Sequence, residues 1–261
     1  MRTVKECTVV AVSTLSLALM TCRVNAQTPS PVQARNVVLV HGAWADGSSW
    51  SEVIERLQAA GLHVTAVQNP LTSVEDSVAE TRRVLAKQDG PTVLVAHSWG
   101  GTVISEAGTD PKVSALVYVA ARAPDANEDF VALSGKFPTM PVRAGVQTRD
   151  GFTTISEEAF IKYFANGVQH EKAEVLYAVQ QPTAAALFGE RTTAAAWQTK
   201  PSWYAVSKLD ETIAPDLERF LANRMKAHTV EVNAGHLSLV SHPREIADLI
   251  LEAAGREKQV R

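Results

Sequence analysis

Ser98 stands where covalent catalysis would place a nucleophile. It follows the apolar run Thr92 to Ala96, which has strand length, and it precedes a helical segment that continues to about Ala107. A nucleophile on such a tight turn between strand and helix has strained backbone angles, so its second neighbours must be small. Those neighbours are Ala96 and Gly100. The pattern predicts an activated serine, and the alternative is a serine that only caps the helix.

Two backbone groups are expected to stabilise the charge that such a nucleophile creates. A carbonyl carbon attacked by a serine becomes a tetrahedral oxyanion, which needs preorganised hydrogen-bond donors. The N–H of Trp99, next to Ser98, supplies one donor, and the N–H of Ala43, just after the first apolar run of the chain, supplies the other. We expect His41 to shape this loop and Trp44 to bind the substrate.

His236 is the histidine placed to accept the proton of Ser98. It lies between the last predicted strand and the last predicted helix, at the same edge of the predicted sheet as the serine. The sequence holds seven histidines. Of the other six, His41 is expected to shape a loop, and His63 and His228 start strands. His97 should face away from Ser98, His170 lies in the insertion, and His242 should cap the last helix.

Asp210 is expected to hold the tautomer of His236 and to stabilise its protonated form. It comes just past the predicted strand 203–206, so it reaches the same sheet edge. Two alternatives remain open: Asp125, just past the fourth strand, as the acid, or a solvated turn around Asp210. The preferred order is therefore Ser98, Asp210, His236, and it involves no metal.

Strands that alternate with helices position these residues. Short apolar runs suit parallel strands buried on both faces. The predicted strands are 36–40, 63–67, 92–96, 113–119, 203–206 and 228–232. Such alternation indicates an α/β fold with a mostly parallel sheet flanked by helices. It breaks at about 124–198, where we expect an inserted helical cap with a hairpin at Asp150-Gly151 and a helical stretch over 183–197.

The motifs together resemble the α/β-hydrolase superfamily over residues 36–254. Four segments carry the resemblance: His41-Gly42-Ala43-Trp44, Ala96-His97-Ser98-Trp99-Gly100-Gly101, Asp210-Glu211-Thr212-Ile213 and Gly235-His236. The superfamily keeps the order serine, acid, histidine, and Ala96 departs mildly from its G-x-S-x-G pattern. The H-G-A-W segment and the compact length are similar to the branch of esterases and hydroxynitrile lyases. The resemblance implies catalytic groups at the carboxyl edge of the sheet, under the cap.

The N-terminal segment is typical of an export signal. A short positive start precedes the apolar stretch Thr8 to Met20, which is too short to span a bilayer, and Ala26 ends a pattern of small or short residues that suits cleavage. We expect loss of residues 1–26 and one hydrolase domain over 27–261, periplasmic or secreted. The alternative is an uncleaved membrane anchor. Both cysteines of the chain lie in the signal, so no thiol chemistry is expected in the domain.

Composition and motifs narrow the function. The 261 residues carry a net charge of −3 without long runs of like charge, so nucleic acid and membrane surfaces are not expected partners. Zinc, phosphate-loop and dinucleotide motifs are absent from the sequence, so we expect no cofactor. The sequence predicts a serine hydrolase that cleaves carboxylic esters of small neutral or apolar substrates through an acyl-enzyme.

Three alternatives share these residues: a perhydrolase, a C–C bond hydrolase, or a binding protein with a vestigial pocket. Leu237 stands where similar hydroxynitrile lyases place a lysine, which argues against cyanohydrin cleavage.

Overall fold

The computed structural model describes residues 33–256. The predicted signal peptide, residues 1–26, lies outside them and stays a prediction. Within the described residues, every helix is too short or too polar to cross a membrane.

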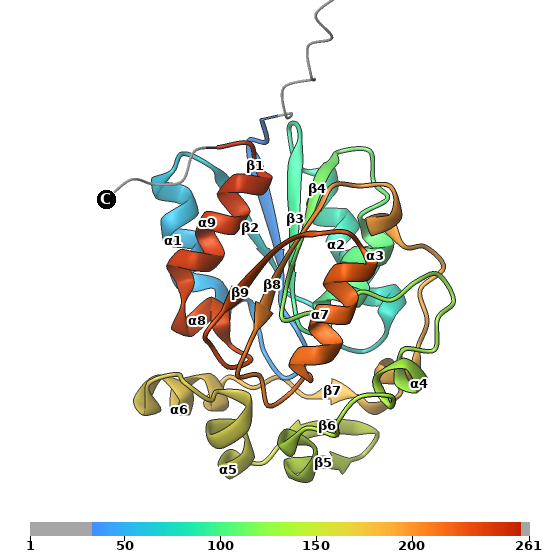
Figure 1. Ribbon diagram of the computed structural model, residues 1–261, viewed down its shortest axis with the longest axis vertical. Helices are drawn as coiled ribbons and strands as arrows, with labels where there is room; N and C mark the ends of the chain where they lie inside the picture. The colour runs from blue at the N-terminus through green and yellow to red at the C-terminus, as the bar shows by residue number, and fades with distance from the viewer. Residues whose placement is uncertain (1–32, 257–261) are drawn as a thin grey trace, which may run out of the picture. The chain divides into compact units, whose positions relative to one another are not determined.

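A six-stranded parallel sheet forms the centre of the fold (Figure 1). Its strands are β1 (Asn36–Val40), β2 (His63–Val67), β3 (Thr92–His97), β4 (Val113–Val119), β8 (Ser202–Ser207) and β9 (His228–Val232). Their spatial order is β2-β1-β3-β4-β8-β9, and neighbouring strands are parallel throughout. The predicted mostly parallel sheet is therefore confirmed. The direction of winding reverses between β1 and β3, and such a reversal opens a crevice for ligands at the carboxyl edge.

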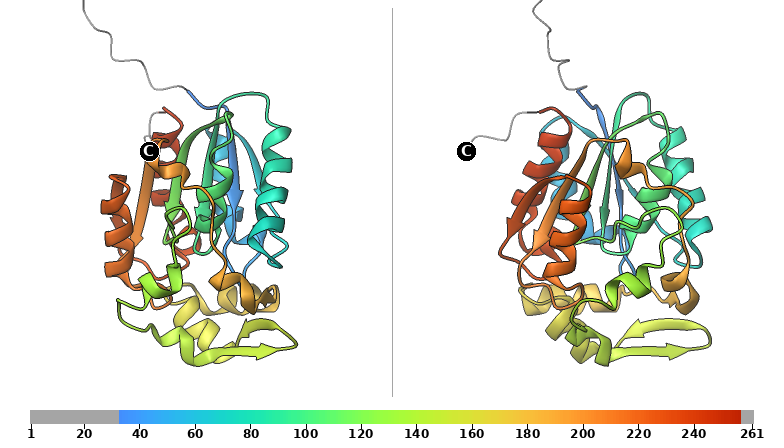
Figure 2. Two further views of the ribbon diagram at one scale, coloured as in Figure 1. Left: turned by 90° about the vertical axis from the view of Figure 1, so that its right-hand side faces the viewer. Right: turned by 45° about the vertical axis from the view of Figure 1, so that its right-hand side comes forward.

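Helices cover both faces of this sheet. α1 (Ser51–Ala59) and α9 (Pro243–Ala253) pack together on one face, and α2 (Val74–Ala86), α3 (Gly100–Ala107) and α7 (Pro215–Arg224) cover the other (Figure 1, Figure 2). Because both faces are covered, β1 and β3 are buried along their whole length. This explains why the two strands read as continuous apolar runs.

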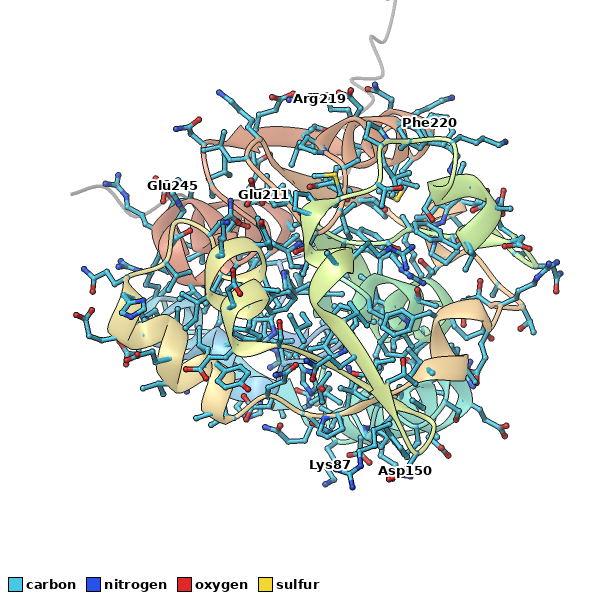
Figure 3. The ribbon with its side chains drawn as sticks, turned by 90° about the horizontal axis from the view of Figure 1, so that it is seen from below. Lys87, Asp150, Glu211, Arg219, Phe220 and Glu245 are labelled. Atoms are coloured by element: carbon cyan, nitrogen blue, oxygen red, sulfur yellow. The ribbon has the colours of Figure 1, made fainter. Side chains whose placement is uncertain are left out.

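The chain between β4 and β8 crosses the carboxyl edge of the sheet, and we call it the cap (Figure 1). Its main elements are α4 (Phe130–Ser134), β5 (Val146–Arg149), β6 (Phe152–Ile155), α5 (Glu157–Ala159), α6 (His170–Ala178) and β7 (Thr183–Ala184). The three strands form a separate antiparallel sheet in the order β5-β6-β7, so the cap is mixed rather than purely helical. Seen from below, it spreads over the sheet edge, with Asp150 at the tip of the hairpin (Figure 3).

The hairpin predicted at Asp150-Gly151 is confirmed. Asp150 has a φ of 50° and Gly151 a φ of 81°, so both central residues are in the left-handed region. A two-residue turn of this kind matches the twist of antiparallel strands. Aspartate and glycine tolerate these angles, which is why this pair ends β5 and starts β6.

The helix predicted over 183–197 is wrong. Thr183 and Ala184 form β7, which pairs with β6, and only short 3-10 turns follow at Ala185–Gly189 and Ala196–Gln198. The alanine-rich sequence favours a helix locally. Pairing of β7 with β6, together with the hydrogen bond from Ala184 N–H to the carbonyl oxygen of Leu71 (2.9 Å), overrides that preference.

Candidate active site

The turn between β3 and α3 holds Ser98 in a strained conformation. Its φ is 54°, in the left-handed region that a residue with a side chain rarely adopts. The residues packed around this turn must be small, because the loop after β1 lies very close to it. A Cβ on Gly42 would lie 2.6 Å from the Cβ of Ser98, and a Cβ on Gly100 would lie 2.7 Å from the carbonyl oxygen of His41. The loop after β1 can therefore approach the serine only because both residues are glycine.

Three side chains from three different loops meet at this turn. Ser98 follows β3, Asp210 follows β8, and His236 follows β9. The Nε2 atom of His236 lies 2.8 Å from the Oγ of Ser98, and its Nδ1 atom lies 2.6 Å from the Oδ2 of Asp210. Ser98, His236 and Asp210 are only 6%, 0% and 2% exposed. The structure thus brings the three predicted residues into one hydrogen-bonded chain.

Backbone groups fix the orientation of the Asp210 carboxylate. Its Oδ1 atom accepts hydrogen bonds from the N–H groups of Thr212 (2.6 Å) and Ile213 (2.8 Å), which leaves Oδ2 for His236. Asp125, the alternative acid, binds elsewhere, since its Oδ1 accepts a hydrogen bond from Gln198 Nε2 at 2.6 Å. The carboxylate that reaches the histidine is therefore that of Asp210.

The loop after β1 places two free backbone donors next to the serine. Ala43, Trp99 and Ser98 line the same cavity, and among the described residues neither Ala43 N–H nor Trp99 N–H has an acceptor. His41 shapes this loop as expected. Its Nδ1 donates to the carbonyl oxygen of Gly42 at 2.9 Å, and its Nε2 accepts from Asn69 N–H at 2.8 Å. The two free N–H groups have the chemistry of an oxyanion site.

A second buried histidine packs against His236. The ring centroids of His97 and His236 are 4.6 Å apart, and Nε2 of His97 donates to the carbonyl oxygen of His236 at 3.0 Å. Burial, followed by the neighbouring His236, holds the pKa of His97 well below its usual value. His97 is therefore neutral in the folded protein and supports the backbone that carries His236.

This buried neutral histidine predicts loss of stability in acid. The pKa of His97 is lower in the folded protein than in the unfolded chain, where it is about 6.5. As pH falls below that value, only the unfolded chain takes up the proton, so His97 contributes a fall in unfolding free energy of up to about 1.4 kcal/mol per pH unit. Burial also lowers the pKa of His41, which adds to the effect.

His97→Gln tests this origin, because a glutamine amide nitrogen can take the place of Nε2. Urea unfolding between pH 5 and pH 8 should show a shallower acid slope in this variant than in the wild type. His170→Gln is the matched control, since His170 is exposed in the cap. Equal slopes for wild type and His97→Gln would contradict the assignment to His97.

Two residues that the sequence patterns did not predict support the segments that carry Asp210 and His236. Asn166, in the cap, accepts from His236 N–H at 3.3 Å and donates from Nδ2 to the carbonyl oxygen of Leu209 at 2.7 Å. Glu218, buried in α7, accepts from Ser207 N–H at 3.0 Å. Burial and the charge of Asp210 raise the pKa of Glu218 well above its usual value. Asn-Gly is a dipeptide typical of turns, which is the one local feature that marks Asn166, and no local pattern marks Glu218.

A cavity of about 480 Å³ opens onto Ser98 beneath the cap. Trp44 lines it as predicted, held by a hydrogen bond from its Nε1 to Thr153 Oγ1 at 3.1 Å. The other large apolar side chains of the lining come mostly from the cap: Phe130, Phe137, Met140, Phe188 and Leu217. Three further aromatic side chains of the cap are buried without lining the cavity: Phe160, Phe164 and Trp197.

The chain belongs to the alpha/beta hydrolase family, whose sequence model matches residues 37–249. It is 26% identical to the putative methylesterase 19 of Arabidopsis thaliana over 86% of this chain and 99% of that protein. It is 34% identical to a carbendazim hydrolyzing esterase of Nocardioides sp. over 45% of this chain and 53% of that protein. The family is one of hydrolases, and both of these relatives are named as esterases.

Solved structures share the fold. Polyneuridine aldehyde esterase matches with a TM-score of 0.73 at 20% identity, covering 84% of this chain and 99% of that one. A pyrethroid hydrolase from Sphingobium faniae JZ-2 matches with a TM-score of 0.70 at 20% identity, covering 84% and 96%. The α/β-hydrolase fold expected from the sequence is confirmed.

Proposed function

We propose that the protein is a serine carboxylesterase that works through an acyl-enzyme. The hydrogen-bonded chain from Ser98 Oγ through His236 to Asp210, open to a cavity at the serine, is the observation that carries this proposal. With its Nδ1 proton held by Asp210, His236 presents an unprotonated Nε2 to the serine hydroxyl. Nε2 takes the proton as Oγ attacks the ester carbon.

The same groups complete the reaction. The N–H groups of Ala43 and Trp99 stabilise the oxyanion, and His236 returns its proton to the departing alcohol. Water then enters, loses a proton to His236 and attacks the acyl carbon. Breaking the bond to Ser98 Oγ releases the acid, and His236 returns its proton to Oγ, which restores the serine hydroxyl. Ser98, Ala43 and Trp99 line one cavity, and each proton transfer passes through the imidazole of His236.

We propose methyl or other short alkyl esters with an apolar acyl part as the substrates. The names of several relatives describe methylesterases, and an alcohol of that size leaves most of the cavity to the acyl part. Trp44, Phe130, Phe137 and Phe188 supply apolar surface for it. Cyanohydrin cleavage is disfavoured because Leu237 follows the histidine and is itself buried.

Covalent labelling tests the nucleophile directly. A fluorophosphonate should add one adduct to the folded wild-type protein, at Ser98, because its phosphorus is attacked as an ester carbon is. Intact mass and peptide mapping measure this adduct. Ser98→Ala should take none under the same conditions. If the folded wild-type protein takes no fluorophosphonate adduct, the hydrolase mechanism is wrong, and the alternative of a binding protein with a vestigial pocket stands.

A further inference from the structure

The cavity at Ser98 carries two positive charges and no negative one. Arg122 and Arg143 both line it, and its lining in the described part of the chain includes neither aspartate nor glutamate. The remaining lining side chains are apolar or bear hydroxyl or indole groups. A cavity with uncompensated positive charge and low-dielectric walls raises the local concentration of anionic ligands.

Arg122 is held beside the nucleophile by the backbone. Its N–H donates to the carbonyl oxygen of Ser98 at 2.9 Å. Its guanidinium Cζ lies 4.8 Å from the ring centroid of Phe130 and 5.3 Å from that of Phe188, and Nη1 donates to the carbonyl oxygen of Phe188 at 3.3 Å. That is its one side-chain hydrogen bond to described residues, so most of its five donors remain for a ligand.

Arg224 shows what Arg122 lacks. The guanidinium of Arg224 also lies near two aromatic rings, 5.3 Å from the Trp197 centroid and 5.5 Å from that of Phe220. Its charge is balanced, since Nη1 pairs with Glu128 at 2.7 Å. Among the described residues, no carboxylate lies within ion-pair distance of Arg122. Of these two arginines near aromatic rings, Arg224 is paired with a carboxylate, whereas Arg122 is paired with none among the described residues.

The charge of Arg122 persists at neutral pH. Burial, with a further contribution from the charge of Arg143, lowers the pKa of Arg122 to about 10. A partly buried cation without a counterion is unfavourable, and an anion in the cavity would relieve that cost. The planar guanidinium matches a carboxylate, with which it forms paired hydrogen bonds.

We propose that Arg122 binds a free carboxylate on the acyl part of the substrate, so that the enzyme acts on half-esters of dicarboxylic acids. This inference rests on the proposed ester hydrolysis. It adds a terminal carboxylate to the apolar acyl part proposed above, and so departs from the neutral substrates expected from the sequence. Hydrolysis adds water across the ester bond, releases the alcohol, and yields the dicarboxylate and a proton. Arg143, exposed at the cavity, adds attraction at longer range.

Substrate pairs of equal size, one charged and one neutral, separate the effect of charge on kcat/KM from the effect of size. The probes are monomethyl esters of straight-chain dicarboxylic acids and the matched methyl esters that end in a carboxamide. A charge-assisted pair predicts that kcat/KM for the best acid exceeds that of its amide by about 10- to 100-fold in the wild type. Arg122→Gln should bring the ratio to about one while amide turnover persists. Arg122→Lys, which keeps the charge without the fork, should fall between.

Arg149→Gln is the matched control. Arg149 is an exposed arginine of the cap hairpin that does not line the cavity. Its replacement should leave the ratio of acid to amide unchanged. A ratio near one in the wild type, or the wild-type ratio retained in Arg122→Gln, overturns the carboxylate subsite and leaves ester hydrolysis standing. Either result would make Arg122 an anchor of the cap through Phe130 and Phe188.

Calorimetric titration gives a readout that needs no turnover. In Ser98→Ala, the half-ester should bind at least tenfold more tightly than its amide, and adding Arg122→Gln should remove the difference. Equal affinities in Ser98→Ala overturn the subsite. If wild type hydrolyses no ester and takes no fluorophosphonate, the proposed function fails, while the titration still decides whether Arg122 binds carboxylate.

Discussion

Replacing Ser98 with alanine is expected to lower kcat for ester hydrolysis by about 10⁶-fold. The Oγ atom lies 2.8 Å from Nε2 of His236, and no other hydroxyl is bonded to that nitrogen among the described residues. Removing it ends acyl-enzyme formation, so only the donors of the oxyanion site and substrate binding continue to assist water. These leave a rate about 10³ to 10⁴ above the uncatalysed reaction.

Wild type and Ser98→Ala should be compared on p-nitrophenyl esters of graded acyl length, which also size the pocket. Ser105→Ala is the matched control. Ser105 is buried in α3, the helix that follows Ser98, but its Oγ donates to the carbonyl oxygen of Gly101 at 2.8 Å and lies 3.1 Å from Tyr118 Oη, away from the histidine. It should keep a rate near that of wild type. Equal rates for wild type and Ser98→Ala would refute the mechanism.

Asp210→Asn is expected to lower kcat by about 10⁴-fold with little change in KM. The reason lies in the two N–H groups, of Thr212 and Ile213, that bind Oδ1. An asparagine must turn its amide oxygen toward them, so its NH₂ group faces Nδ1 of His236. The NH₂ group of the asparagine and the Nδ1–H of His236 would then both be donors facing each other, unless the imidazole proton moves from Nδ1 to Nε2. That tautomer presents an N–H to Ser98 and cannot accept its proton.

Two other aspartates serve as matched controls for this change. Asp125→Asn replaces the acid considered as the alternative, and Asp216→Asn replaces an exposed carboxylate of α7 that pairs with Arg219 at 2.9 Å. Both should keep kcat within a few-fold of wild type, since neither contacts His236. A large loss in Asp125→Asn together with full activity in Asp210→Asn would reverse the assignment of the acid.

Local patterns in the sequence were sufficient for the sheet and for most of the site. Buried parallel strands need apolar side chains on both faces, so β1 and β3 appear as continuous apolar runs that can be recognised without knowledge of the neighbouring strands. The position of Ser98 can be recognised in the same way, because a strand, a tight turn with small flanking residues and a helix form a pattern that is visible within about ten residues of sequence. Chain order then placed Asp210 and His236 at the same edge.

Long-range contacts decided the second half of the cap and the charge of the pocket. Residues 183–197 favour a helix by composition, but β7 pairs with β6, and a preference of tenths of a kcal/mol per residue cannot resist such pairing. Arg122 follows β4 as Ser98 follows β3, yet its missing counterion becomes evident only when the residues around it are known.

The burial of a side chain and the charges around it depend on neighbouring residues that come from distant parts of the chain. Asn166 and Glu218 illustrate this, because each acts through loops 11 to 70 residues away. The sequence by itself determined the sheet and the class of chemistry, since both follow from short-range patterns. The folded chain determined which carboxylate meets His236, how the cap covers the sheet edge and which charges line the cavity, since these depend on long-range contacts.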